Sequence, residues 1–486
     1  MKKILILIII FVMFVSQTNI AIAAFPSASY EIIEPSGGRG TSSSMTNLPK
    51  LVSDDKYLYS LVVIGDQTLW DQNQLGLRIQ RKQINTTENF ITIWEKPNGV
   101  FLVNGGIVLD KNGRLHIFYV NNVNALGQLA HEIANTPQSY PVTFSPDKLL
   151  PLNNTCKNCR LGLTYDYSTD SIFIVFDQLI NNYPEWAYSY IAVYKNNSWS
   201  TPEIILKMYY EYLTVDESVV FGYFYPKIIV FNDQLHVFYV GHPYGSIKFN
   251  GIPTQIKWFK NLTHYYRNLS GGSWASEIIR DTQKSLDEII ANPSLQNIER
   301  NFFDDVFVTG DNQLAVVGTY VNCPNQIGGS YSCNLQDSIR QTIEYLNPTG
   351  IGNWNNLVLY QYNYKVCVQK TSDGVYHLLK PGFNDELEYA QSIDGKSWTD
   401  RPISQKPNFT LQGGHGCLEE NGRSLNEAYA QVDGYTPSQV TTNKSSHTVI
   451  LTKIDLSKDI TDFRKILSTF TSIFDYNQLV VNFGSR

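Results

Sequence analysis

The sequence predicts an all-β fold, in which four-stranded antiparallel sheets repeat as the six or seven blades of a β-propeller, followed by a short C-terminal helix. Three observations carry this prediction. The 486 residues include 31 Tyr and 24 Phe but only 17% charged residues, and aromatic residues favour strands. A polar turn followed by an apolar strand recurs along the chain. In several copies a second hairpin follows, and it ends near a Trp.

The recurring turn is made of Asp, Asn and Gly. Residues 110–114 precede an apolar strand over 115–120, and residues 232–234 precede a similar strand over 235–240. Asp, Asn and Gly tolerate the backbone angles of tight turns, and an apolar run suits a strand that is buried on both faces. The copies are roughly 50 to 80 residues apart, a period typical of propellers. Their strands begin at positions 57, 115, 171, 235, 313, 375 and 424.

The second hairpin completes the repeating unit. Two consecutive hairpins form a four-stranded antiparallel sheet, which is the unit of a propeller. Counting the strand starts gives seven blades, and leaving out the divergent last copy gives six. A pair of β-sandwich domains is the alternative, but it does not predict a hairpin and a Trp recurring in phase. The extended segment over 27–33 is a candidate for the outer strand of the last blade, which would close the ring.

An N-terminal signal peptide is predicted over residues 1–23. Two lysines precede an apolar block over 4–15, and small residues follow at 21–24, the order found in cleaved signal peptides. An uncleaved membrane anchor is the alternative, but polar residues at 16–19 leave the block shorter than the roughly 20 residues of a spanning helix. We therefore expect a secreted protein, extracellular or periplasmic if the source is a Gram-negative bacterium, with no integral membrane segment in the mature chain.

The mature chain is divided into a propeller over 25–455 and a tail over 456–486. Apolar residues recur at helical spacing after Asp459, which predicts one amphipathic helix packed on the β body, with docking of a partner as the alternative. The chain is expected to be a monomer. The net charge is −6 and no block of Lys and Arg is present, so nucleic acid and anionic membrane surfaces are poor candidate partners.

All six cysteines lie in the mature part: Cys156, Cys159, Cys323, Cys333, Cys367 and Cys417. An even number in an exported chain favours disulfides. The residues at 367 and 417 fall on the strand before the turn of neighbouring repeats, so we pair them, and we pair 323 with 333 across a loop. The Cys-x-x-Cys at 156 and 159 lacks a second pair that would complete a metal site. A local bridge is predicted there, with no metal and no cofactor.

One turn resembles a known motif. Ser392, Asp394, Gly395 and Trp398 look like a shortened Asp-box, the turn of sialidase-type propellers and related BNR-repeat proteins, although one residue before the Gly is missing. In such a turn the Asp caps backbone amides, the Gly takes a positive φ and the Trp packs under the hairpin. The segment over 112–119 also resembles inner strands of bacterial propeller lectins and sialidase-like proteins. The resemblance implies that the Asp-box residues are structural and not catalytic.

The resemblance to sialidases implies which residues a catalytic site would need. A sialidase holds its substrate carboxylate with three arginines and uses a Tyr with a nearby Glu as nucleophile and an Asp as acid. The nearest match to the family's first Arg-Ile-Pro motif is Arg78, which lacks the Pro and falls inside the first repeat. No spacing singles out Arg267, Arg280 or Arg300. We therefore expect binding of glycans or cell-surface glycoproteins without catalysis, with an exo-sialidase-like hydrolase and a structural envelope or matrix protein as alternatives.

Several residues are candidates for ligand binding. Gly residues flank His415 in a loop that can border a site at the channel mouth, although a loop tied by Cys417 is the alternative. His116 and His236 share one register, which favours hydrogen bonding between packed blades over a metal site. An indole can cover the apolar face of a sugar or plug its own hairpin. The candidate tryptophans are Trp199, Trp274, Trp354 and Trp398.

Overall fold

The computed structural model describes the chain in segments, and the predicted signal peptide and C-terminal helix lie outside them. In these segments no helix is long and apolar enough to cross a membrane. The helical elements described are α3 (Leu286–Ala291) and η1 (Pro293–Asn297), and the remainder is β structure and connections. The described residues are 27–34, 48–64, 75–123, 126–145, 148–149, 160–323, 339–361, 366–381, 387–401, 403, 410–418, 427–435 and 448–455.

Two large antiparallel sheets come first along the chain. The seven-stranded sheet has the order β2-β3-β4-β5-β6-β7-β8. Its strands are β2 (Leu51–Ser53), β3 (Tyr57–Ile64), β4 (Leu75–Gln83), β5 (Ile91–Leu109), β6 (Leu115–Val123), β7 (Leu126–Ala134) and β8 (Lys148–Leu149). The ten-stranded sheet runs from β9 to β18. Its strands are β9 (Leu161–Asp166), β10 (Ser171–Asn182), β11 (Glu185–Lys195), β12 (Ser198–Trp199), β13 (Glu203–Thr214), β14 (Glu217–Phe231), β15 (Gln234–Phe249), β16 (Ile252–Lys257), β17 (Asn261–Asn268) and β18 (Ala275–Arg280).

Three four-stranded antiparallel sheets follow, and the N-terminal strand β1 (Ser27–Glu34) completes the last of them in the order β1-β29-β28-β27. This is the outer position that the sequence predicted for residues 27–33. The strands of the first two are β19 (Glu299–Val308), β20 (Leu314–Asn322), β21 (Ile339–Asn347), β22 (Asn355–Gln361), β23 (Cys367–Lys370), β24 (Tyr376–Pro381), β25 (Leu387–Ser392) and β26 (Thr399–Asp400). Those of the third are β27 (Thr410–Cys417), β28 (Ala428–Tyr435) and β29 (Thr448–Asp455).

Each large sheet consists of two four-stranded units joined through long strands. The first part of β5 pairs with β4, and its residues 105–109 pair with β6. The β13–β14 hairpin joins the two units of the ten-stranded sheet. The second strands of the units begin within a few residues of the predicted starts, as for β3, β6, β10, β15, β20, β24 and β28. The predicted four-stranded antiparallel repeat is therefore confirmed.

The apolar core lies between neighbouring units. Val108 and Phe118 of β5 and β6 pack with Ile174 of β10 in one buried cluster. The opposite face of β10 contributes Val175 to a second cluster with Val237 of β15. Both faces of a unit are thus covered, which explains why its second strand is apolar throughout.

A disulfide links the first strands of two neighbouring sheets. Cys367 on β23 and Cys417 on β27 are bonded, with a Cα–Cα distance of 5.5 Å. This is the pair that the register of the repeats predicted. Cys323 is also disulfide-bonded, while Cys156, Cys159 and Cys333 lie outside the described residues.

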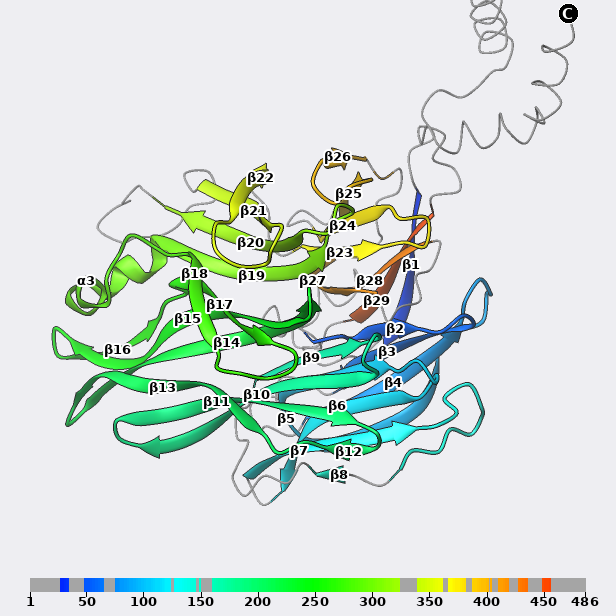
Figure 1. Cartoon of the computed structure of the whole chain (residues 1–486), viewed down its shortest axis with the longest axis horizontal. Coiled ribbons are helices and arrows are strands. Elements are labelled where there is room, and N and C mark those ends of the chain that lie inside the picture. Colours follow the sequence, from blue (N-terminus) through cyan, green and yellow to red (C-terminus); the bar gives the residue numbers. More distant parts are fainter. Residues whose placement is uncertain are drawn as a thin grey trace, which may run out of the picture.

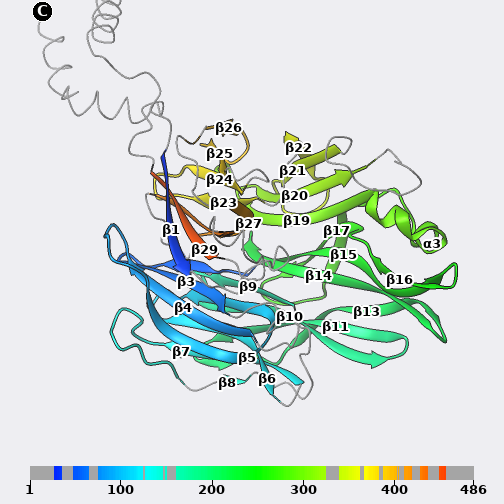
Figure 2. The ribbon, with the colours of Figure 1, turned by 180° about the vertical axis from the view of Figure 1, so that it is seen from behind.

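The long strands of the ten-stranded sheet extend past the repeat on one side of the molecule. Figure 1 shows the ends of β13 and β16 and the helix α3 on the side opposite to β1 and β29, and Figure 2 shows the same arrangement from behind. Trp258, which follows β16, is fully buried in an apolar cluster with Val219, Ile247 and Ile289 of α3. Because of this packing, the extension has its own small core and can hold side chains in fixed positions.

Candidate functional site

The base of the extension carries a group of positive side chains, which we name the basic cluster: Arg160, Lys257 and Arg300, with Tyr244 and the buried His242. Arg160 directly precedes β9, Lys257 ends β16 and Arg300 is the second residue of β19. The charges of all three act on His242. The cluster therefore combines residues from three separate four-stranded units.

The extension and η1 hold the cluster together. Tyr244 and Lys257 are paired directly across β15 and β16, and the Tyr244 side chain is 39% exposed. The backbone N–H of Lys257 donates to Oε1 of Gln296 at 2.6 Å, and Nε of Arg300 donates to the Gln296 carbonyl at 3.2 Å. Gln296 thus links the strand end that bears Lys257 to the strand that bears Arg300.

His242 is a buried histidine. Its ring is 0% exposed, and neither ring nitrogen has a hydrogen-bond partner among the described residues. The ring stacks on Phe259 at a centroid distance of 4.5 Å and meets Phe224 edge-on at 5.1 Å. Gly222 pairs with His242 across the strands, and a Cβ there would lie 2.2 Å from the Phe224 ring. Burial and the three nearby cations hold the pKa of His242 well below its usual range, so the ring is neutral at pH 7.

Two cations of the cluster, Arg160 and Lys257, differ from Arg300 in their contacts. The guanidinium of Arg160 lies 3.7 Å above the Phe224 ring and 4.7 Å from the Tyr225 ring. Within the described part of the chain, neither Arg160 nor Lys257 forms an ion pair. Burial, with the charges of Arg160 and Arg300, lowers the pKa of Lys257. The site therefore has an excess of positive charge that a bound anion would relieve.

Asp177 is a buried acid on which the charge of Arg160 acts. Asp177 lies near the end of β10, and burial raises the pKa of its carboxyl to about 7, although a hydrogen bond from Ser189 and the charge of Arg160 oppose the rise. The Ser189 hydroxyl lies 2.9 Å from the hydroxyl of Tyr239 on β15. Asp177 is therefore largely protonated below neutral pH and does not cancel the positive charge of the cluster.

Tyr225 beside the cluster has an unusual backbone. Its φ is 59°, and the other residues with positive φ in the described segments, apart from glycines, are Asn or Asp. The β14–β15 register shifts between Phe224 and Lys227, where Tyr225 forms a bulge. A left-handed conformation costs an aromatic residue roughly 1 to 3 kcal/mol, and such strain occurs often at functional sites. The bulge places the buried Tyr225 ring against Arg160.

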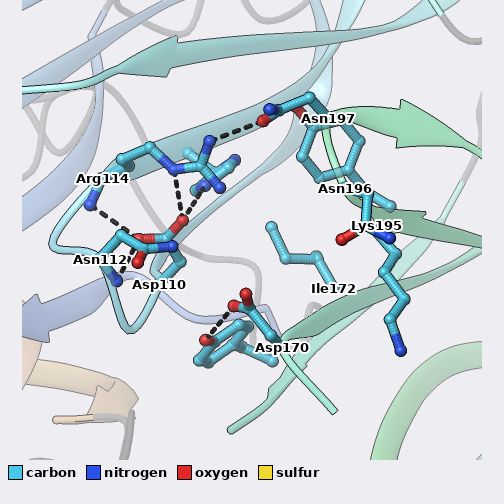
Figure 3. A pocket seen from close by; sticks show the side chains of 11 residues that line it. Asp110, Asn112, Arg114, Asp170, Ile172, Lys195, Asn196 and Asn197 are labelled. Carbon is cyan, nitrogen blue, oxygen red and sulfur yellow. Dashed lines mark hydrogen bonds and ion pairs between the residues drawn. The ribbon is translucent and has the colours of Figure 1, made fainter.

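A cavity of about 210 Å³ opens at the other end of the strands, where the turns before β6 and β10 meet the β11–β12 turn. We name it the turn pocket. Asp110 on one side of it accepts bonds from the backbone N–H groups of Asn112 and Arg114 at 2.9 and 2.8 Å. It also pairs with Nε of Arg114 at 2.6 Å and lies 3.2 Å from Nε2 of His116. Figure 3 shows Asp110 and Arg114 facing Asn197 across the pocket.

Histidine pairs lie below the turns in two units. Nδ1 of His116 is 3.0 Å from Nε2 of His131, and Nδ1 of His236 is 2.9 Å from Nε2 of His264. All four rings are buried. The shared register of His116 and His236 thus reflects hydrogen bonding to a histidine on the neighbouring strand. In the described segments no group of His, Cys, Asp and Glu could hold a metal ion.

The four predicted tryptophans lie in different units, and no two of them are in ring contact within the described residues. The Trp199 ring meets His131 of the preceding unit edge-on at 5.3 Å, and the Trp354 ring meets His264 at 5.7 Å. Nε1 of Trp354 donates to Glu277 at 2.9 Å and Nε1 of Trp398 donates to Glu344 at 3.3 Å. Arg267 lies 4.9 Å above the Trp274 ring. These contacts favour the packing interpretation of the tryptophans.

The resemblance to an Asp-box has a structural counterpart. Asp394 accepts the backbone N–H groups of Lys396 and Ser397, each at 2.8 Å, and Gly395 has a φ of 78°. The backbone of Gly395 also donates to Oγ of Ser392 at 2.8 Å. These bonds hold the pKa of Asp394 below its usual range although burial opposes this. The turn therefore has the capping role that the resemblance implies.

The remaining sequence candidates are separated. His415 lies on β27, where the register shifts between Gly414 and Gly416, and its side chain is outside the described set. Arg78 pairs with Glu34 and with Glu95. Arg267 pairs with Glu203 at 2.8 Å, and Arg280 lies over the Tyr320 ring. Of the arginines considered from sequence, Arg300 belongs to the basic cluster.

Sequence reasoning missed Arg160, His242, Tyr244 and Lys257. One signal was available, because the longest interval between repeats runs from the strand at 235 to the strand at 313 and contains Lys257 and Arg300. Insertions that exceed a repeat are frequent sites of function. No insertion in the repeat pattern indicates Arg160, because it directly precedes β9, the first strand of a regular unit.

No family model matches the sequence, and no curated protein matches it. Among solved structures, the polysaccharide lyase Uly1 is similar over 90% of this chain and 94% of its own, with 11% identity and a TM-score of 0.51. The α-L-arabinofuranosidase Arb93A of Fusarium graminearum covers 73% of this chain and 93% of its own, with 13% identity and a TM-score of 0.43. The Trypanosoma rangeli sialidase covers 92% and 62%, with 8% identity and a TM-score of 0.39. The similarity to Uly1 shows a shared fold, which in this chain is an all-β arrangement of four-stranded antiparallel units.

Proposed function

We propose that this chain binds an acidic carbohydrate at the basic cluster, on a secreted seven-bladed propeller. The observation that carries the proposal is the group of Arg160, Lys257 and Arg300 around the neutral His242, in which Arg160 and Lys257 have no ion pair within the described residues. Positive side chains without an ion pair attract an anion.

A sugar acid fits this chemistry. A guanidinium pairs with a carboxylate or a sulfate through two parallel hydrogen bonds. The Arg160 guanidinium, which has no ion pair in the described residues, provides such a group. Arg300 adds positive charge, and its own guanidinium donates to Gln296 and Asn297. The half-exposed ring of Tyr244 beside Lys257 offers a face on which a pyranose can stack. The fold shared with a protein named as a polysaccharide lyase supports carbohydrate over other anions. The expected ligand is therefore a glycan that carries uronate, sialate or sulfate groups.

The architecture supports the same proposal. Counted from the strand pairings, the units whose second strands are β3, β6, β10, β15, β20, β24 and β28 would be seven blades. The pairing of β1 with β29 is the contact expected where a propeller closes. The Cys367–Cys417 disulfide supports export to an oxidising compartment.

The proposal is tested by calorimetric titration of the protein with an oligogalacturonate, a sulfated oligosaccharide, a sialoside and a neutral oligosaccharide. We expect an acidic ligand to bind and the neutral one to bind more weakly. Lys257→Ala removes an unpaired cation of the cluster, whereas Lys248→Ala removes an exposed lysine of the same hairpin that pairs with Asp216 at 2.6 Å. Lys257→Ala should weaken binding by about tenfold, or about 1.4 kcal/mol, and Lys248→Ala should leave it unchanged.

Equal effects of the two lysine substitutions, or no preference for acidic ligands, would contradict the proposal. Mass spectrometry of the same mixtures then decides between binding alone and catalysis. Intact oligosaccharide supports binding without turnover. Cleaved products, either hydrolysed or unsaturated, make the basic cluster the substrate site of an enzyme. Absence of binding by any glycan would favour a structural role in an envelope or matrix.

A further inference from the structure

The turn pocket lies at the end of the strands away from the basic cluster, and it exists because one turn is short. Where the β19–β22 and β23–β26 sheets meet, the backbone N–H of Gly310 donates to the Asp394 carbonyl at 2.9 Å, so the two turns are in direct contact. The β11–β12 connection is instead a two-residue turn of Asn196 and Asn197, with φ of 51° and 61°. A shorter turn leaves the corresponding space open.

At a second place where two units meet, a turn also occupies the space that is open in the turn pocket. Between the β14–β18 strands and the β19–β22 sheet, Gly352 donates its backbone N–H to Glu277 at 2.9 Å. A Cβ at Gly350 would lie 2.8 Å from the ring of His236, so this turn rests directly on the histidine pair. His116 is the equivalent of His236, and its ring lines the open cavity instead. The turn pocket is thus an opening in a junction that is closed at these other units.

The acids of the turn pocket are already neutralised. The Asp110 carboxylate is hydrogen-bonded to two backbone N–H groups and to the side chains of Arg114 and His116. Burial opposes ionisation of Asp110, but bonds from His116 and Arg114 hold its pKa at about 2. Asp170 accepts the Tyr165 hydroxyl at 2.8 Å and pairs with Lys111 at 3.1 Å. A charged ligand would meet no uncompensated opposite charge from these acids, so an uncharged polar ligand fits best.

Unused hydrogen-bonding groups point to a ligand. Tyr194 lines the pocket and is 3% exposed, and its hydroxyl has no hydrogen-bond partner in the part of the chain that the structure describes. A buried unpaired hydroxyl costs about 1 to 3 kcal/mol, which a ligand or an ordered water would recover. Figure 3 shows Asn112 and Asn196 on opposite sides, with the apolar side chain of Ile172 between them and the amino group of Lys195 pointing away. Amide groups around an apolar floor suit the hydroxyls and the ring face of a sugar.

We propose that the turn pocket binds a single neutral sugar residue, with the Tyr194 hydroxyl as its buried hydrogen-bond partner. The cavity of about 210 Å³ is smaller than the about 300 to 1,000 Å³ of pockets for drug-sized ligands, so it holds one ring and not a chain. This site is independent of the basic cluster. The protein would then contact carbohydrate at both ends of its blades, through an acidic group at one end and a neutral residue at the other.

The test is saturation-transfer NMR of the full mature protein with galactose, mannose, N-acetylglucosamine, xylose and rhamnose, beside glucuronate as the charged probe. We expect at least one neutral sugar to receive saturation, and Tyr194→Phe to weaken its binding by about fivefold, the loss of one neutral hydrogen bond. The melting temperature of Tyr194→Phe should be equal or higher, because its parent hydroxyl is unpaired. Asn196→Gly, which keeps the positive φ, should also weaken binding.

Two controls separate this site from the rest of the molecule. Tyr190→Phe changes a hydroxyl on the same strand outside the pocket and should leave the neutral sugar bound as before. Arg160→Ala should also retain it, whether or not the acidic glycan binds at the basic cluster. The proposal is overturned if no neutral sugar receives saturation, if glucuronate is preferred at this site, or if Tyr194→Phe binds as tightly as the parent.

Discussion

Asp110 on the second unit and Asp177 on the third are both buried acids, but their pKa values are shifted in opposite directions. Asp110 in the turn pocket receives backbone amides, Arg114 and His116, and its pKa is held at about 2. Asp177 near the basic cluster is dominated by burial, and its pKa is raised to about 7. The Asp110 carboxylate is therefore ionised and paired within the protein, whereas Arg160 and Lys257 of the basic cluster form no ion pair among the described residues. This difference is consistent with a structural role for Asp110 and with the proposed binding of an anion at the basic cluster.

The largest effect is expected from Asp110→Asn. The substitution removes a carboxylate that accepts four hydrogen bonds, so we expect the free energy of unfolding at pH 7 to fall by about 2 to 4 kcal/mol. Because the folded pKa is lowered, this contribution is present above the unfolded pKa of about 3.9 and is lost as the pH falls through about 2. Urea unfolding at pH 7 and pH 3 measures it. A loss that does not shrink at low pH would show that the ionised carboxylate is not the cause.

Asp177→Asn should have the opposite pH dependence. The folded pKa of about 7 lies above the unfolded value of about 3.9, so the parent protein loses stability as the pH rises through about 7. Asparagine cannot ionise, and the variant should gain about 2 kcal/mol relative to the parent between pH 5 and pH 8. Urea unfolding at those two values checks the gain. A constant difference between variant and parent would mean that Asp177 is already ionised at pH 5.

The smallest change in stability, and the clearest change in binding, is expected from Arg160→Ala. The guanidinium stacks on Phe224 and has no ion pair in the described segments, so its loss should alter the free energy of unfolding by about 1 kcal/mol or less. The affinity for an acidic oligosaccharide should fall by about tenfold or more. Circular dichroism melting and calorimetry measure the two quantities on one preparation. A large loss of stability with unchanged affinity would make Arg160 a structural residue.

Local sequence determined most of the fold. The turn at 110–114 and the apolar strand after it are defined by adjacent residues, so their period could be read directly and led to the Cys367–Cys417 pairing. The basic cluster has no such pattern. Lys257 and Arg300 lie on different units and are brought together by Gln296 of η1, and Arg160 joins them only because β9 packs beside β14. Long-range packing of this kind leaves no periodic mark in one sequence.

The tryptophans were easy to recognise in the sequence, but they are not part of the candidate site. Their recurrence in the sequence was conspicuous, and it marked the repeat correctly. The repeat is a property of blade packing, however, and Trp199, Trp354 and Trp398 lie against residues of the preceding unit. A periodic residue is therefore a guide to architecture, while the site is expected where the repeat is interrupted.

A crystal structure of the mature protein with a bound acidic oligosaccharide would show whether the basic cluster is the glycan site. We expect density for a carboxylate or sulfate against Arg160 in the basic cluster, with a sugar ring against Tyr244. An acidic sugar bound elsewhere on the molecule, with the basic cluster left empty, would contradict it.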